Sequence, residues 1–200
     1  DLHSFPTRRS SDLRLGKEEI LSNIEACLAL VEIIRTTLGP RGMDKMIIGE
    51  GSTTTISNDG ATIIKLLNIE HPAAKSLADV AKSQDNEIGD GTTSVMIFAG
   101  ELLKEAKQFI EDGMSPQIII NGYWKGLQAA RKRLEECAIT INDKSEEEKR
   151  NLLLKCAETS LNSKLIANYK EFFSKMIVDA VEKLEGFKDK DLIGIKHVTG

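Results

Sequence analysis

Three glycine-containing turns carry the residues with the clearest chemical potential: "TLGPRG" (37–42), "NDG" (58–60) and "GDGTTS" (89–94). Taken alone, each has an ordinary explanation as a helix end, a hairpin turn or a loop. In the third turn, however, Gly89 and Gly91 let main-chain N–H groups approach a bulky anion, and three hydroxyl residues open the next helix. Helix N-termini bind phosphate through these N–H groups and the macrodipole. The third turn therefore predicts a phosphate site.

A carboxylate in the same turn refines that prediction. Asp90 would repel a bare phosphate, but it fits a site in which Mg²⁺ lies between the carboxylate and phosphate oxygens. Asp59, in the second turn, is then a candidate to position or deprotonate an attacking water. The sequence has neither G-x-x-x-x-G-K-[ST] nor a G-x-G-x-x-G after a strand, so such a nucleotide site must belong to a different fold.

Composition narrows the class of protein. The 200 residues are 40% hydrophobic and 29% charged, which is typical of a globular chain. A formal net charge of −4 gives no reason to expect nucleic acid or an anionic membrane as a partner. Apolar runs such as Ile118–Ile120 are far shorter than the roughly 20 residues of a membrane span. Three widely spaced cysteines without C-x-x-C spacing predict reduced, buried thiols and a cytoplasmic protein.

The elements that must position these turns are mostly helices. Apolar residues at helical spacing predict a helix from Lys17 that stops at Gly39-Pro40. The remaining segments predict a hairpin and a series of helices, with a final strand that is cut short: hairpin 45–57 and helices 61–67, 72–84, 92–111, 116–137, 146–161 and 169–184, with a strand over 191–200. Ser115 before Pro116 predicts an N-cap, and Ser145 with Glu148 predicts a capping box. The fold class is therefore mainly α with a small β element.

Four stretches, in this order and spacing, resemble the group II chaperonins, the family of the TCP-1 ring complex and the thermosome. They are "RTTLGPRGMDKMI", "ISNDGATIIKLL", "HPAAKSLADVAKSQDNEIGDGTTSV" and "LNSKLI". The resemblance runs from about Gly16 to Gly200. It implies the N-terminal half of a helical equatorial domain over 14–143, and over 144–200 the end of that segment with the start of the intermediate domain. The apical domain and the C-terminal equatorial half would lie beyond Gly200, whereas 1–13 match nothing and are expected to be an artefact or disordered.

The resemblance also implies a role for each turn, with ATP and Mg²⁺ as cofactors. Asp90 would bind Mg²⁺ and Asp59 would be a catalytic carboxylate near the attacking water. The phosphates would be contacted by main chain and hydroxyl groups at Leu38, Gly39, Pro40, Gly60, Gly91, Thr92, Thr93 and Ser94. Asn162, Ser163 and Lys164 would form a loop that senses the γ-phosphate; a flexible ammonium can follow a departing phosphate, although Lys164 could equally be a solvated loop lysine.

The implied function is that of a subunit of a cytoplasmic ATP-dependent chaperonin. Its implied partners are paralogous subunits in a double ring and unfolded clients such as actin and tubulin. One alternative is a ring subunit that binds nucleotide with little hydrolysis of its own. Another is a phosphotransferase, for which the sequence offers no acceptor site. Without the missing parts, the isolated chain is expected to bind ATP weakly and to hydrolyse it poorly or not at all.

Overall fold

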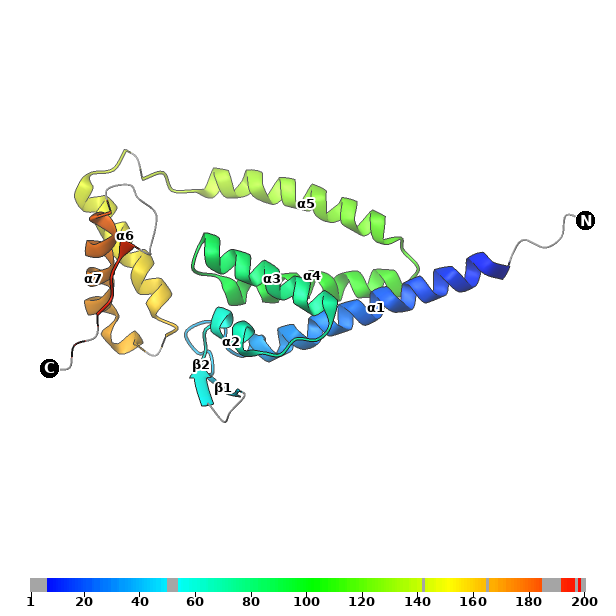
Figure 1. Ribbon diagram of the computed structural model, residues 1–200. Helices are drawn as coiled ribbons and strands as arrows, with labels where there is room; N and C mark the ends of the chain where they lie inside the picture. Colours follow the sequence, from blue (N-terminus) through cyan, green and yellow to red (C-terminus); the bar gives the residue numbers. More distant parts are fainter. Residues whose placement is uncertain are drawn as a thin grey trace, which may run out of the picture. The chain divides into compact units, whose positions relative to one another are not determined.

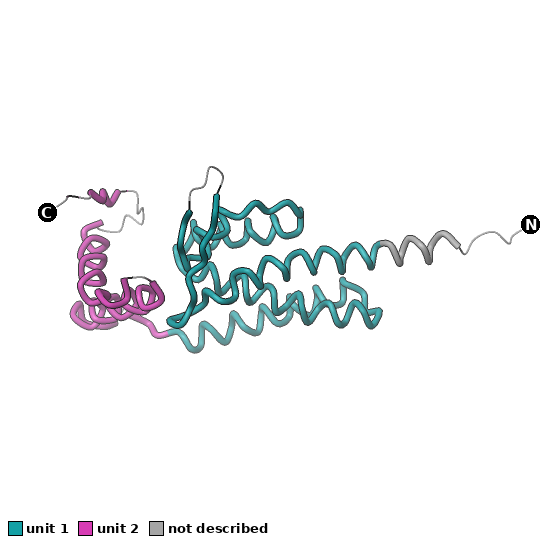
Figure 2. The backbone as a smooth tube through the Cα atoms, turned by 90° about the horizontal axis from the view of Figure 1, so that it is seen from below, with its two compact units in different colours: residues 1–138 teal, residues 139–200 magenta. Residues whose placement is uncertain are grey.

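The computed structural model describes residues 7–49, 54–141, 143–164, 166–184, 192–196 and 198, with side chains from Gly16 onward. Contacts between residues divide the chain into two units, residues 1–138 and residues 139–200 (Figure 2). Unit 1 contains most of the helices and the small sheet, and unit 2 contains a helical hairpin. The mainly helical fold class with one small β element is confirmed.

Unit 1 is built on three helices that pack on one another: α1 (Thr7–Arg35), α3 (Pro72–Glu87) and α4 (Thr92–Glu111) (Figure 1). Helix α1 begins at Thr7 rather than near Lys17, so part of the segment expected to be an artefact or disordered is helical. The core between these helices is aliphatic, as the low aromatic content predicts, and Val31, Ile34 and Met96 are fully buried in it. Burial of each such side chain contributes about 2 kcal/mol.

A hairpin and a short helix complete the packed part of unit 1. Strands β1 (Lys45–Ile48) and β2 (Thr54–Ser57) are antiparallel, with Met46 opposite Ile56. Helix α2 (Gly60–Leu66) follows at once and buries Ile63 and Ile64 against the core. The predicted hairpin is confirmed; its turn lies outside the described residues.

Helix α5 (Pro116–Cys137) departs from expectation, because none of its residues is buried. From the sequence, apolar faces such as Ile118–Ile120 and the segment around Tyr123-Trp124 are expected to be mostly core, with some packing on neighbouring subunits. In the structure Ile118, Trp124 and Leu134 are each at least 60% exposed. Helix α5 packs on α4, and Tyr123 donates a hydrogen bond to the Leu102 carbonyl across that contact (2.5 Å). A hollow of about 490 Å³ with an almost entirely apolar lining lies between the two helices. Ser115 precedes α5 but makes no side-chain cap bond.

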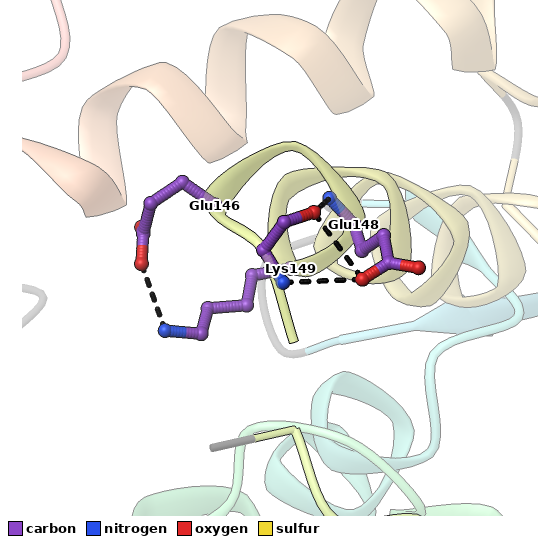
Figure 3. Close-up of polar contacts among 4 residues, drawn as sticks. Glu146, Glu148 and Lys149 are labelled. Atoms are coloured by element: carbon purple, nitrogen blue, oxygen red, sulfur yellow. Dashed lines mark hydrogen bonds and ion pairs between the residues drawn. The ribbon is translucent and has the colours of Figure 1, made fainter. Parts of the chain in front are cut away.

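Unit 2 pairs α6 (Glu146–Leu161) with α7 (Lys170–Glu182), joined by the short 3₁₀ helix η2 (Ala167–Tyr169). The predicted capping box is confirmed: Ser145 Oγ accepts from the Glu148 N–H, and the Ser145 N–H donates to Glu148 Oε2 at 3.1 Å (Figure 3). Arg150 of α6 bonds to both Asp179 and Glu182 of α7, which ties the two helices together.

Two expectations from the sequence, one for the last ten residues and one for the cysteines, are wrong. Residues 192–196 and 198 form no strand, since no partner strand lies beside them among the described residues. Cys27 is buried, and its burial raises the pKa of its thiol, but Cys137 and Cys156 are exposed. Both exposed cysteines lie on helices that bury no residue, so an apolar neighbourhood in sequence did not predict burial.

Within the described range, no helix is long and apolar enough to cross a membrane.

An ion pair between α1 and α4 predicts acid sensitivity. Arg35 Nη2 donates to Glu101 Oε1 at 2.5 Å, and this bond holds the pKa of Glu101 below its ordinary value of 4.5. A lowered pKa stabilises the folded chain above the unfolded value, and that stabilisation is lost as the pH falls through the folded value. The melting temperature of Glu101→Gln should therefore lie below that of the parent at about pH 6 and approach it at about pH 3. A difference in melting temperature that stayed constant from about pH 6 to about pH 3 would contradict this prediction. Glu135→Gln, at an exposed position of α5, is the control.

Candidate functional site

The turn between α3 and α4 presents a helix N-terminus whose N-cap residue makes no side-chain cap hydrogen bond. Gly89 and Gly91 both have left-handed backbones, with φ of 80° and 77°. Gly91 is the N-cap of α4, makes no side-chain cap bond, and is followed by a first turn without acidic residues. The first N–H groups of any helix lack intrahelical acceptors and carry partial positive charge. The N–H groups of Thr92, Thr93 and Ser94 are therefore arranged to receive an anion.

Asp90 lies at the exposed tip of this turn. Its Oδ1 accepts the Gly91 N–H at 2.7 Å, which fixes the carboxylate beside the start of α4. Among the described residues no three His, Cys, Asp or Glu side chains gather closely enough to hold a metal ion. A cation at Asp90 would consequently take most of its ligands from elsewhere, as Mg²⁺ does when it binds one carboxylate together with phosphate oxygens. The residues present fit a magnesium–nucleotide, not a metal held by protein side chains alone.

Asp59 is held at the N-terminus of α2. Its Oδ2 accepts from both the main-chain N–H of Thr62 (3.1 Å) and the Thr62 hydroxyl (2.9 Å), so it is the N-cap of the helix. The sequence predicts a catalytic role for Asp59, but the hydrogen bonds from Thr62 were not predicted. The spacing of an Asp three residues before a Thr at a helix start is the signal that could have revealed the cap.

Gly60 brings the second and third turns together. A Cβ placed on Gly60 would lie 2.6 Å from Thr93 Oγ1 and 3.2 Å from the Thr93 main-chain nitrogen. The start of α2 therefore lies against the start of α4, and Asp59 directly precedes this contact. Gly60 is helical and is not among the described glycines with positive φ, so a left-handed backbone is not the reason for a glycine here. Its missing side chain is needed for close approach instead.

The first turn, at Leu38–Pro40, is closed by its own hydrogen bonds. Gly39 has a left-handed backbone (φ 78°), and its carbonyl accepts the Gly42 N–H at 2.9 Å. Thr37, which the sequence reasoning overlooked, is buried and donates its hydroxyl to the Ile34 carbonyl at 2.8 Å. A Cβ at position 42 would lie 2.3 Å from the Thr37 carbonyl oxygen, so glycine is required there as well. This turn exposes Leu38.

The segment Asn162–Lys164 belongs to unit 2 and follows α6. Asn162 is the C-cap of α6, and its Oδ1 accepts from Lys170 Nζ at 3.2 Å. The Lys164 N–H donates to the Leu161 carbonyl, and the Lys164 carbonyl accepts from the Ala167 N–H (3.1 and 3.0 Å). These bonds give a compact turn that half-exposes the Lys164 side chain.

Comparison with known proteins assigns the chain to a family. Residues 30–200 match the TCP-1/cpn60 chaperonin family. The chain belongs to this family. It is 62% identical over 191 residues to "T-complex protein 1 subunit eta" of Tetrahymena pyriformis, 53% identical to the protein of the same name in Dictyostelium discoideum, and 51% identical to that in Homo sapiens. These matches cover 95–96% of this chain, and it spans about a third of the length of each relative, 34% to 36%.

The resemblance to group II chaperonins inferred from the motifs is thus confirmed, and the relatives named above are all eta subunits. Within this chaperonin chain, the described contacts join Gly60 to Thr93 and so place Asp59 near the start of α4. Gln84, in the last turn of α3, also contacts the third turn and was not predicted to do so: its side chain donates to the Asp90 carbonyl at 2.9 Å. A single glutamine on a helix carries no motif, so no sequence signal was available for it.

Proposed function

We propose that the chain is part of a subunit of an ATP-driven chaperonin ring, in which binding and hydrolysis of Mg²⁺-ATP drive closure around an unfolded client. The observation that carries this proposal is the close approach of Gly60 to Thr93, because Asp59 directly precedes Gly60 and Thr93 lies in the first turn of α4. Membership of the chaperonin family supports the same reading.

Each group in the turns has a distinct task in this proposal. Mg²⁺ supplies charge neutralisation for the phosphates when it is bound. The N–H groups of Thr92, Thr93 and Ser94 bind phosphate oxygens, while Asp90 holds the cation and the Leu38–Pro40 turn contacts the nucleotide by main chain. Asp59 orients a water and takes its proton at the carboxylate. The Asn162–Lys164 turn responds to the γ-phosphate through the Lys164 ammonium.

The ring and its clients form the second half of the proposal. The relatives named T-complex protein 1 subunit eta support an assembly with paralogous subunits in a double ring in the cytoplasm. Unfolded proteins such as actin and tubulin are the proposed clients. Nucleic acid and membrane are not proposed as partners, in keeping with the net charge of −4.

Asp90→Ala in the full-length protein tests the site. Loss of the carboxylate is expected to lower Mg²⁺-dependent ATP hydrolysis at least about tenfold, because the cation loses its protein ligand. Asp112→Ala is the matched control, since Asp112 is an exposed aspartate at the opposite end of the same helix α4 and should change the rate less than about twofold. Equal rates for Asp90→Ala and Asp112→Ala would overturn the assignment.

Native mass of the full-length protein with its paralogues tests the ring. A particle of many subunits is expected, and a monomer under all conditions would contradict the chaperonin role. ATP binding without measurable hydrolysis by the wild-type subunit would instead favour the nucleotide-binding ring subunit with little turnover.

A further inference from the structure

Gln84 begins the turn that carries Asp90. It lies in the last turn of α3, half-buried, and its main-chain carbonyl accepts the N–H groups of both Ile88 (3.0 Å) and Gly89 (3.3 Å). These two bonds end the helix and turn the chain at Gly89, whose left-handed backbone suits a helix C-terminus. The main chain of Gln84 therefore fixes where the turn leaves α3.

The side chain of the same residue holds the far end of the turn. Gln84 Nε2 donates to the Asp90 carbonyl at 2.9 Å. It also lies 3.4 Å from the point that a Cβ on Gly91 would occupy, so the amide rests against both residues of that peptide bond. Gln84 thus holds the turn on both sides, by its main chain at Gly89 and by its side chain at Asp90.

The hydrogen bond from the Gln84 side chain also affects where the Asp90 carboxylate lies. The Asp90 carbonyl and the Gly91 N–H belong to one trans peptide, so they point in opposite directions. With the carbonyl held toward Gln84, the Gly91 N–H points away from Gln84, and there it donates to Asp90 Oδ1 at 2.7 Å. Rotation of this peptide would remove the N–H from the carboxylate, so the amide of Gln84 controls the position of the Asp90 side chain.

We propose that Gln84 is a positioning residue that holds the Asp90 carboxylate in the orientation required to bind the magnesium ion of a bound nucleotide. The inference rests on the proposed function, because it concerns the same cation. Gln84 lies outside the glycine-rich turns. If it positions the cation ligand, its loss should weaken ATP binding only when Mg²⁺ is present, whereas a purely structural role would affect binding with and without Mg²⁺.

The test measures equilibrium binding of ATP to the full-length protein by calorimetry, once with Mg²⁺ and once with a chelator. Gln84→Met keeps the length of the side chain and removes the donor. It is expected to weaken ATP binding in Mg²⁺ about fivefold, as loss of one hydrogen bond would. Binding without Mg²⁺ should change less than about twofold, since no cation then depends on Asp90. Gln108→Met, at an exposed position of α4, should change neither value.

A double variant shows whether Gln84 acts through Asp90. In an Asp90→Ala background, Gln84→Met is expected to have no further effect on binding in Mg²⁺, because residues that act as a unit are not additive. Full additivity, or equal weakening with and without Mg²⁺, would overturn the inference. If Gln84→Met fails to assemble, Gln84→Leu takes its place: it is also uncharged, removes the donor to the Asp90 carbonyl, and carries the same expectations.

The two proposals fail in different ways. If Asp90→Ala weakens Mg²⁺-dependent binding but Gln84→Met does not, the positioning role is wrong and the proposed function stands. If Asp90→Ala itself leaves Mg²⁺-dependent binding unchanged, the proposed metal site is wrong and the inference falls with it.

Discussion

Asp59→Asn in the full-length protein is expected to lower ATP hydrolysis about 100-fold or more while the protein still folds and binds ATP. The reason is that Asp59 has two separable roles. Its carboxylate caps α2 by accepting from Thr62, and in the proposed mechanism it also takes a proton from the attacking water. Asparagine caps a helix as well as aspartate does, but it cannot serve as a general base.

Asp59→Ala removes both the helix cap and the proposed general base, so it is the reference with which Asp59→Asn is compared. It should hydrolyse ATP as slowly as Asp59→Asn and, in addition, lose about 1 kcal/mol of stability with the cap. The measurements are steady-state hydrolysis at saturating Mg²⁺-ATP, the melting temperature, and ATP binding by calorimetry. Asp44→Asn, at an exposed position before β1, is the control for the substitution itself.

The comparison of the two variants decides which role matters. If Asp59→Asn hydrolyses ATP within about threefold of the parent rate while Asp59→Ala is slow, then the cap alone explains the effect and the assignment of a base is wrong. If both variants are fast, Asp59 lies outside the catalytic site.

Local chemistry explains what could be predicted from the sequence. The helix ends at glycine, the capping box at Ser145 and the hairpin at 45–57 depend on residues a few positions apart, and all three are present. Helical periodicity likewise predicted α4 and its end near Gly113. Such features follow from backbone sterics and short-range hydrogen bonds, which a single sequence displays directly.

Features that depend on distant partners could not be predicted in this way. The apolar periodicity of α5 was interpreted as core, because periodicity reveals an apolar face but not whether anything covers it. The strand expected in the last ten residues is absent from 192–196 and 198, the part that the structure describes, since a strand needs a partner for its hydrogen bonds.

The same distinction between local features and distant partners applies to the residues of the candidate site. Asp59, Asp90 and the hydroxyl residues could be proposed from the sequence because motifs and chemistry mark them. The contact of Gln84 could not be predicted, because it joins one side chain to a main-chain carbonyl six residues away. The close approach at Gly60 could not be predicted either, because Thr93 is 33 positions further along the chain.

Gly60→Ala is expected to lower ATP hydrolysis about tenfold, although position 60 contributes no group that reacts. The new Cβ would lie 2.6 Å from Thr93 Oγ1 and 3.2 Å from the Thr93 nitrogen, so the Thr93 side chain must turn away and the starts of α2 and α4 must shift by a few tenths of an ångström. A displacement of about 1 Å between reacting groups can cost about 100-fold, so the smaller shift is expected to cost less. Gly122→Ala in α5, where an added Cβ meets nothing within 4 Å, is the matched control and should leave the rate unchanged.

A second substitution separates this steric explanation from a conformational one. Thr93→Ala removes the Oγ1 that lies closest to the new Cβ and leaves the main-chain nitrogen in place. Gly60→Ala should therefore cost less in a Thr93→Ala background than in the parent, when each rate is compared with its own reference. An identical cost in both backgrounds would mean that glycine is needed at position 60 for a reason other than its contact with Thr93. The approach of α2 to α4, on which the proposed site depends, would then not be what the glycine preserves.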